Sequence, residues 1–322
     1  MKRFQNIVFI LADEDFNSPS NALQRAVTLA NNNQAELTLL HIVPKLSVTS
    51  ESESFQQRLS ELHQQALSNE QQRLQALAHS LPYQTQVQVR SGKKYMEVIL
   101  AVLAEGYDLV AKAADETLWL DRILGSNDMN LLRKCPCPVW LMRGDEKQDY
   151  KNIIAAVDFN AEQSQHHDQQ LNTLITDLAS SLALSDFATL HVANAYDVPE
   201  AGFISLWVEQ PDDVERELYE TECDIRQSKM NHLLSDMKHR LGEQNYQYLA
   251  PRKHLRKGEP AQELAKLAEE LEADLVVMGT VSRTGIAGVL IGNTAEAMLS
   301  QLTCSVLVVK PEGFVCPINT SS

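Results

Sequence analysis

The chain repeats itself, and this repeat constrains its fold more than any other feature of the sequence. Five short blocks of the first half return in the same order, about 150 to 167 residues later. The paired blocks begin at Asn6 and Asn152, Leu39 and Thr189, Gly92 and Gly258, Tyr107 and Ala273, and Cys137 and Cys304. A duplicated chain of 322 residues fits two domains of ordinary size. We therefore predict two tandem domains, residues 1–146 and 147–322, joined by the charged segment 144–150.

Each half alternates short apolar runs with longer amphipathic segments, which predicts strands and helices around a parallel sheet. In the second half the expected strands are 153–157, 188–192, 247–255, 275–278 and 306–309, and the expected helices are 162–181, 212–241, 260–271 and 294–301. In the first half the long helix is expected at 51–79. The predicted fold is an α/β fold with two five-stranded parallel sheets, each covered by helices on both faces. We expect the two domains to pack as a pseudo-dimer through their last strands, 139–142 and 306–309, whose edges would otherwise stay open.

Charge and composition exclude several classes of protein. Lys and Arg number 28 against 43 Asp and Glu, a net charge of −15, so general affinity for nucleic acid is not expected. No run of 18 apolar residues predicts a membrane span, and no signal-peptide cleavage pattern follows the N-terminus, so we expect a cytoplasmic protein. The five cysteines include no C-x-x-C pair and no clustered histidine, so no metal site is predicted. Cys135 and Cys137 are expected to be reduced, half-buried thiols.

The segment from Val276 to Thr294 carries the strongest functional signal. An expected strand ends at Gly279, a loop of about a dozen residues follows, and a helix is expected to begin at Gly292-Asn293-Thr294. In open α/β sheets ligands bind beyond the carboxyl ends of the strands, glycine lets backbone approach a ligand, and helix starts favour anions. Arg283 is the only charged residue of this loop and suits a phosphate. The alternative is a plain connection whose glycines serve turns and caps.

Other residues allow two interpretations each. Asp158 follows the first strand of the second half, where its carboxylate could bind a ribose or a base, or cap a helix. The basic stretch 252–257 is either a solvated strand edge or an attraction for an acidic ligand. His41 and His191 fall in paired blocks, which favours a shared structural hydrogen bond over catalysis.

These residues resemble those of the universal stress protein superfamily in its tandem form. Nucleotide-binding members carry Gly, two residues, Gly, nine residues, Gly, then Ser or Thr. Here Gly279, Ser282, Gly292 and Asn293 occupy these four places, with Thr294 one step on. The resemblance implies an adenine nucleotide alpha-hydrolase-like, Rossmann-like fold. It also implies a small ligand, ATP or another adenine nucleotide, with Asp158 and Val192 on the ribose and adenine side and Met278 in the base pocket.

The first half has diverged from the same motif. Ala12 stands in the place of Asp158, although Asp13 follows it, and Ala113 stands in the place of Gly279. The loop after Ala113 carries Asp115, Glu116 and Asp121 against Arg122, and such acids oppose a polyphosphate. Only Gly125-Ser126 retains the end of the motif. We predict that the first domain does not bind a nucleotide.

The predicted function is that of a stress-response protein that binds its ligand in the second domain and acts through conformation or partner binding. It needs no cofactor and has no predicted catalytic residue, since the sequence contains no G-x-S-x-G, H-E-x-x-H or P-loop motif. Two alternatives remain open: a slow nucleotide hydrolase, and a ligand-free scaffold for protein partners or self-association.

Overall fold

The computed structural model describes residues 4–45, 52–114, 127–159, 165–198, 211–280 and 291–318. These residues form two compact units, with the division between Gln148 and Asp149. The packing of the two units as a pseudo-dimer stays a prediction.

The first unit contains a five-stranded sheet in which all neighbouring strands are parallel, in the order β3-β2-β1-β4-β5. Its strands are β1 (Asn6–Ile10), β2 (Glu36–Val43), β3 (Gln86–Ser91), β4 (Leu109–Ala113) and β5 (Val139–Met142). Its helices are the 3-10 helix η1 (Asp13–Phe16) and α1 (Asn21–Asn33), α2 (Glu53–Ser80), α3 (Lys94–Glu105) and α4 (Asn127–Lys134).

The second unit repeats this arrangement, with the parallel order β10-β9-β6-β7-β8. Its strands are β6 (Asn152–Ala156), β7 (Thr189–Tyr196), β8 (Arg252–Lys257), β9 (Leu275–Gly279) and β10 (Ser305–Val309). Its helices are α5 (Gln165–Asp186), α7 (Pro211–Leu241), α8 (Glu243–Leu249), α9 (Pro260–Glu270) and α10 (Asn293–Leu299). The predicted pair of five-stranded parallel sheets is confirmed.

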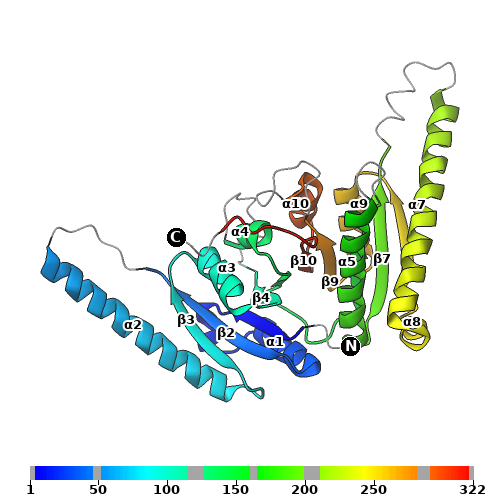
Figure 1. Cartoon of the computed structure of the whole chain (residues 1–322). Coiled ribbons are helices and arrows are strands. Elements are labelled where there is room, and N and C mark those ends of the chain that lie inside the picture. Colours follow the sequence, from blue (N-terminus) through cyan, green and yellow to red (C-terminus); the bar gives the residue numbers. More distant parts are fainter. Residues whose placement is uncertain are drawn as a thin grey trace. The chain divides into compact units, whose positions relative to one another are not determined.

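Helices cover both faces of each sheet, as predicted. In the second unit α5 packs against α7 and α8, while α9 packs against α10 (Figure 1). The spacing of apolar residues explains the burial: α9 starts with Pro260 at its first turn and buries Ala261, Leu264, Leu267 and Ala268, three to four residues apart. The central strands β6 and β9 are buried on both faces, which explains their unbroken apolar runs.

The strand register confirms the duplication but corrects the pairing of the histidines. Asn6 pairs with Glu36, and Asn152 pairs with Thr189, so β2 and β7 align from these residues. His41 is then the sixth residue of β2, whereas His191 is the third residue of β7. The two histidines are not equivalent, and the expected shared hydrogen bond is wrong.

One expected strand is also wrong in its first part. Residues 243–249 form α8, which follows Gly242 in a left-handed conformation (φ 77°) at the end of α7. The strand β8 starts only at Arg252. Within this unit β8 is an edge strand paired only with β7, which fits the solvated-edge interpretation of the basic stretch.

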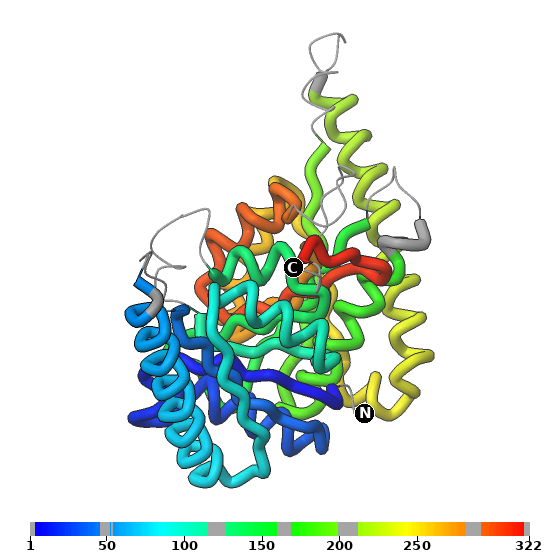
Figure 2. Tube along the Cα trace, turned by 60° about the vertical axis from the view of Figure 1, so that its left-hand side comes forward, coloured from blue at the N-terminus to red at the C-terminus, as the bar shows by residue number. Residues whose placement is uncertain are grey.

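The C-terminal residues of the chain follow β10. Residues 314–318, at the red end of the trace in Figure 2, group with the first unit. The Cys316 thiol donates to the carbonyl oxygen of Lys134 over 3.3 Å. The boundary of the second domain at residue 322 stays a prediction.

Candidate functional site

Polar residues follow several strands of the second unit at the carboxyl edge of its sheet. Ala156 pairs with Met278, so Asp158 and Thr280, each two residues further on, lie at the same edge. Asn194 lies near the end of β7, and Lys310 directly follows β10. This is the edge at which open α/β sheets bind their ligands.

Asp158 has a fixed backbone and an accessible carboxylate. The side chain of Asn172, on α5, accepts a bond from the Asp158 N–H (3.1 Å) and donates to its carbonyl oxygen (2.6 Å). The carboxylate itself is 62% exposed. A ligand hydroxyl or amino group can therefore reach a carboxylate whose backbone is held by two hydrogen bonds.

Arg226, on α7, reaches the same edge and was not predicted. Its Nη1 donates to Asn194 Oδ1 over 3.2 Å and lies 3.9 Å from Asp158 Oδ1. Its Nε donates to Glu222 over 2.6 Å, and its guanidinium lies 5.3 Å from the ring centroid of Tyr196. Asn194 in turn donates to the carbonyl oxygen of Val157. These contacts place a charged guanidinium beside the predicted ribose and adenine side.

Val192, which the resemblance places on that side, lies deeper in the sheet. It is the fourth residue of β7, pairs with Ala155 and is fully buried. Asn194, two residues on, is the β7 side chain that the structure brings to Asp158 and Arg226.

Met278 and Gly279 end β9, as the motif predicts, but the structure explains the glycine differently. A Cβ atom built on Gly279 would lie 2.7 Å from a terminal carbon of Leu171, on α5. The missing side chain therefore allows α5 to pack on the sheet. The sequence-based interpretation, that the glycine lets a ligand approach, stays a prediction beside this packing role.

We expect Gly279→Ala to lower the free energy of unfolding by about 1–3 kcal/mol, since Leu171 must shift to admit the new methyl group. In a Leu171→Ala background the same substitution should cost almost nothing further, because the clash is gone. Urea unfolding of both single variants and of the double variant measures this coupling. Additive effects of the two substitutions would show that Leu171 does not explain the glycine.

The loop after β9 is described only at its ends. Lys310 Nζ donates to Thr280 Oγ1 over 2.6 Å, with both side chains buried, and Gly292 N–H donates to the Thr280 carbonyl oxygen. Asn293 and Thr294 are exposed in the first turn of α10. Ser282 and Arg283 lie outside the described residues. The structure thus brings Thr280, Gly292 and the start of α10 together, as expected for the two ends of this loop.

In the first unit the equivalent positions are filled differently. Ile10 pairs with Lys112, so Lys112 stands where Met278 stands in the second unit. Lys112 and Asp128, on α4, form an ion pair whose side chains are 4% and 0% exposed. The acids Asp115, Glu116 and Asp121 lie outside the described residues. A buried ion pair thus replaces the apolar residue of the expected base pocket.

At the carboxyl ends of strands β1 and β2, the side chains of the first unit contact one another. The Phe16 ring packs edge-on against His41, and Arg73 stacks 4.4 Å from the Phe16 centroid. His41 Nε2 lies 3.8 Å from Asp13 and 3.9 Å from Glu70. Burial lowers the pKa of His41, although both carboxylates act against this shift. His41, covered by the Phe16 ring, therefore occupies the position in β2 that Asn194 occupies in β7.

The side chains at the carboxyl edge of the second unit's sheet can bind a polar ligand. Asp158 accepts hydrogen bonds, while Arg226 and Lys310 supply cations that are already paired within the protein. Within the described residues, no three His, Cys, Asp or Glu side chains are arranged to hold a metal ion. Asn194, Arg226 and Lys310 carried no local signal, since each acquires its role through contacts between distant segments.

Comparison with known proteins agrees with this architecture. The universal stress protein family model matches residues 4–143 and 149–310. Universal stress protein E of Photorhabdus laumondii is 26% identical over all of this chain and 99% of its own length, and a homolog in Haemophilus influenzae is 29% identical over 96% and 98%. The crystal structure of a protein of unknown function from Pseudomonas aeruginosa is 25% identical, covers 96% of this chain and 94% of its own, and has a TM-score of 0.63.

In the part of the chain that the structure describes, no helix is both long and apolar enough to cross a membrane. Two matches of one family model, relatives that share nearly the full length, and the repeated five-stranded sheet all lead to the same assignment. The chain belongs to the universal stress protein family and carries two domains of that family in tandem.

Proposed function

We propose that the protein binds one adenine nucleotide per chain, at the carboxyl edge of the second sheet, and acts in the stress response through conformation or partner binding. Asp158, Met278, Gly292, Asn293 and Thr294 would form the site. Ser282 and Arg283 complete the motif in sequence. The free thiols of all five cysteines fit a reducing compartment such as the cytoplasm.

The difference between Met278 and Lys112, which share one register position, carries this proposal. An apolar, buried methionine next to Gly279 offers the surroundings that a nucleobase needs. A lysine paired with Asp128 fills the same position in the first unit, and Phe16 and Arg73 cover the neighbouring strand ends. Arg226, which lies 3.9 Å from Asp158 and also binds Glu222, competes with a ligand for the Asp158 carboxylate, which fits an affinity of micromolar or weaker, about −8 kcal/mol at best.

Calorimetric titration of the full chain with ATP tests the proposal. We expect one site, weakened about tenfold or more by Asp158→Asn, because a hydrogen bond to a charged acceptor contributes about 1.5–3 kcal/mol. Asp13→Asn is the matched control in the first unit and should leave the affinity unchanged. Arg283→Glu and added salt should weaken binding as well.

The same samples separate the alternatives. Two equivalent sites, or binding that ignores both Asp158→Asn and Arg283→Glu, would overturn the assignment to the second unit. Absence of heat from folded protein would favour the scaffold. Release of phosphate at a constant rate from bound ATP would favour the hydrolase.

A further inference from the structure

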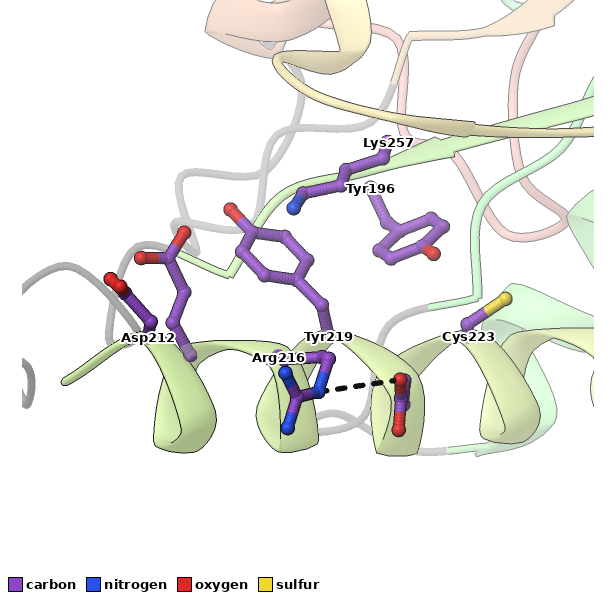
Figure 3. Close-up of a pocket in the computed structure, with 8 residues that line it drawn as sticks. Tyr196, Asp212, Arg216, Tyr219, Cys223 and Lys257 are labelled. Atoms are coloured by element: carbon purple, nitrogen blue, oxygen red, sulfur yellow. Dashed lines mark ion pairs between the residues drawn. The ribbon is translucent and has the colours of Figure 1, made fainter. Parts of the chain in front are cut away.

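A second concave site lies beside the edge described above. A pocket of about 460 Å³ opens between the N-terminal half of α7 and the ends of β7 and β8 (Figure 3). Its lining residues are Tyr196, Asp212, Glu215, Arg216, Tyr219, Glu220, Cys223 and Lys257. This volume lies within the range of small-molecule sites, and none of these residues belongs to the proposed nucleotide site.

Two phenol rings form its inner surface. Tyr196, the last residue of β7, is 6% exposed, and Tyr219 faces the same space from α7 (Figure 3). Tyr219 is held in place because its hydroxyl donates to Asp197 over 2.9 Å. A planar ligand can therefore stack on rings that are already ordered.

Lys257 supplies a positive charge above the Tyr219 ring. Its Nζ lies 3.4 Å from the Tyr219 ring centroid, and no carboxylate among the described residues lies within ion-pair distance of it. Arg216, the other cation of the lining, is paired with Asp213 (2.6 Å) and Glu220 (4.0 Å). Three acids also line the pocket. Asp212 and Glu220 are exposed to solvent, which screens them, whereas Glu215 is half-buried. Lys257 is the lining cation that no carboxylate of the described residues pairs, so its ammonium is the group available to a bound anion.

The first unit lacks this combination. Val43 pairs with Ser91 at the register position where Tyr196 pairs with Lys257. The ring and the ammonium are thus specific to the second unit rather than a consequence of the shared fold.

We propose that this pocket binds a planar aromatic anion, stacked on Tyr219 and Tyr196 and paired with Lys257. The acidic group of the ligand would replace the tyrosine ring as the partner of the ammonium. The site is separate from the nucleotide site, and either can exist without the other.

Anilinonaphthalene sulfonate is a suitable probe, since phenyl naphthylamine offers the same rings without the charge. Fluorescence titration of the full chain should show that Lys257→Gln weakens the sulfonate about five- to tenfold and leaves the uncharged amine unchanged. Lys253→Gln removes the same charge from the same strand and should change neither. Tyr219→Leu should weaken both probes, whereas Tyr248→Leu, at an exposed ring on α8, should weaken neither.

Cys223 locates the bound probe directly. We expect the sulfonate to slow alkylation of Cys223 by iodoacetamide, measured by mass spectrometry, with the partly exposed Cys316 as the internal reference. Asp158→Asn should leave this protection intact, so failure of the nucleotide proposal would not affect the result. Equal sulfonate affinity in wild type and Lys257→Gln, or an unprotected Cys223 at saturation, would overturn the inference.

Discussion

Lys112→Met should lower the free energy of unfolding of the first unit by about 3–5 kcal/mol. Lys112 and Asp128 form an ion pair that is almost fully removed from water. Removing only the lysine takes the Lys112 ammonium away from the buried Asp128 carboxylate. Methionine itself suits the position, because β9 carries Met278 at the same register. The loss therefore measures the removal of the ammonium rather than a misfit of the new side chain.

Urea unfolding followed by tryptophan fluorescence measures this loss. With Trp119 and Trp207 replaced by Phe, Trp140 is the only tryptophan, and it is buried in β5. The double variant Lys112→Met with Asp128→Asn should recover to within about 2 kcal/mol of wild type. Lys266→Met breaks an exposed pair with Glu263 and should cost no more than about 0.5 kcal/mol. If Lys112→Met lowered the free energy of unfolding no more than Lys266→Met does, the buried ion pair would not stabilise the first unit.

This ion pair marks the limit of prediction from sequence. The repeat block at Tyr107 corresponds to the block at Ala273, which leads into the expected strand 275–278, and the matching run 109–113 forms β4 with one lysine among apolar residues. The partner of that lysine lies 16 residues away and comes to it only through the packing of α4 on the sheet. Strand and helix types follow local patterns, whereas charge pairing depends on the tertiary arrangement.

In the candidate site, too, some residues were predictable from the sequence and others were not. Asp158 and Gly279 were predicted because they follow or end apolar strands, and Met278 because the resemblance to the family places it in the base pocket. Arg226 is one of many charged residues on α7, and only the fold shows that it faces Asp158 and Asn194.

Local resemblance also misled the repeat alignment. The Leu-His pairs at 40–41 and 190–191 look equivalent in sequence, but the strand register places them three residues apart. Register is set by side chains on both faces and by neighbouring strands, not by one short match.

His191, which has no histidine at the equivalent position of the first unit, should make the stability of the second unit sensitive to acid. His191 is 1% exposed, and its Nδ1 lies 2.9 Å from His254 Nε2. Burial, with His254 and Arg252 nearby, lowers the pKa of His191 from 6.5 to about 4. Burial also lowers the pKa of His254, with Arg256 and Arg252 acting the same way and Glu270 opposing. Both rings are therefore neutral in the folded protein at pH 7.

The unfolded chain binds the proton first, since the pKa of His191 is lower in the folded state. The stabilising contribution is complete above pH 6.5 and is lost as the pH falls from 6.5 to about 4. We expect this loss to reach about 3 kcal/mol in the second unit. Urea unfolding between pH 7.5 and 4.5 follows it, and NMR titration of the His191 ring should show no protonation near pH 6.5.

The first unit provides the matched control, because its register holds Thr38 and Gln88 where the second unit holds His191 and His254. The double variant His191→Thr with His254→Gln should be less stable at pH 7.5, since threonine fills less of the buried space. Its stability should nevertheless fall less steeply toward pH 4.5, because neither ring remains to take up a proton. An equally steep fall in this variant, or a His191 ring that titrates near pH 6.5 in the folded protein, would show that other groups govern the acid response.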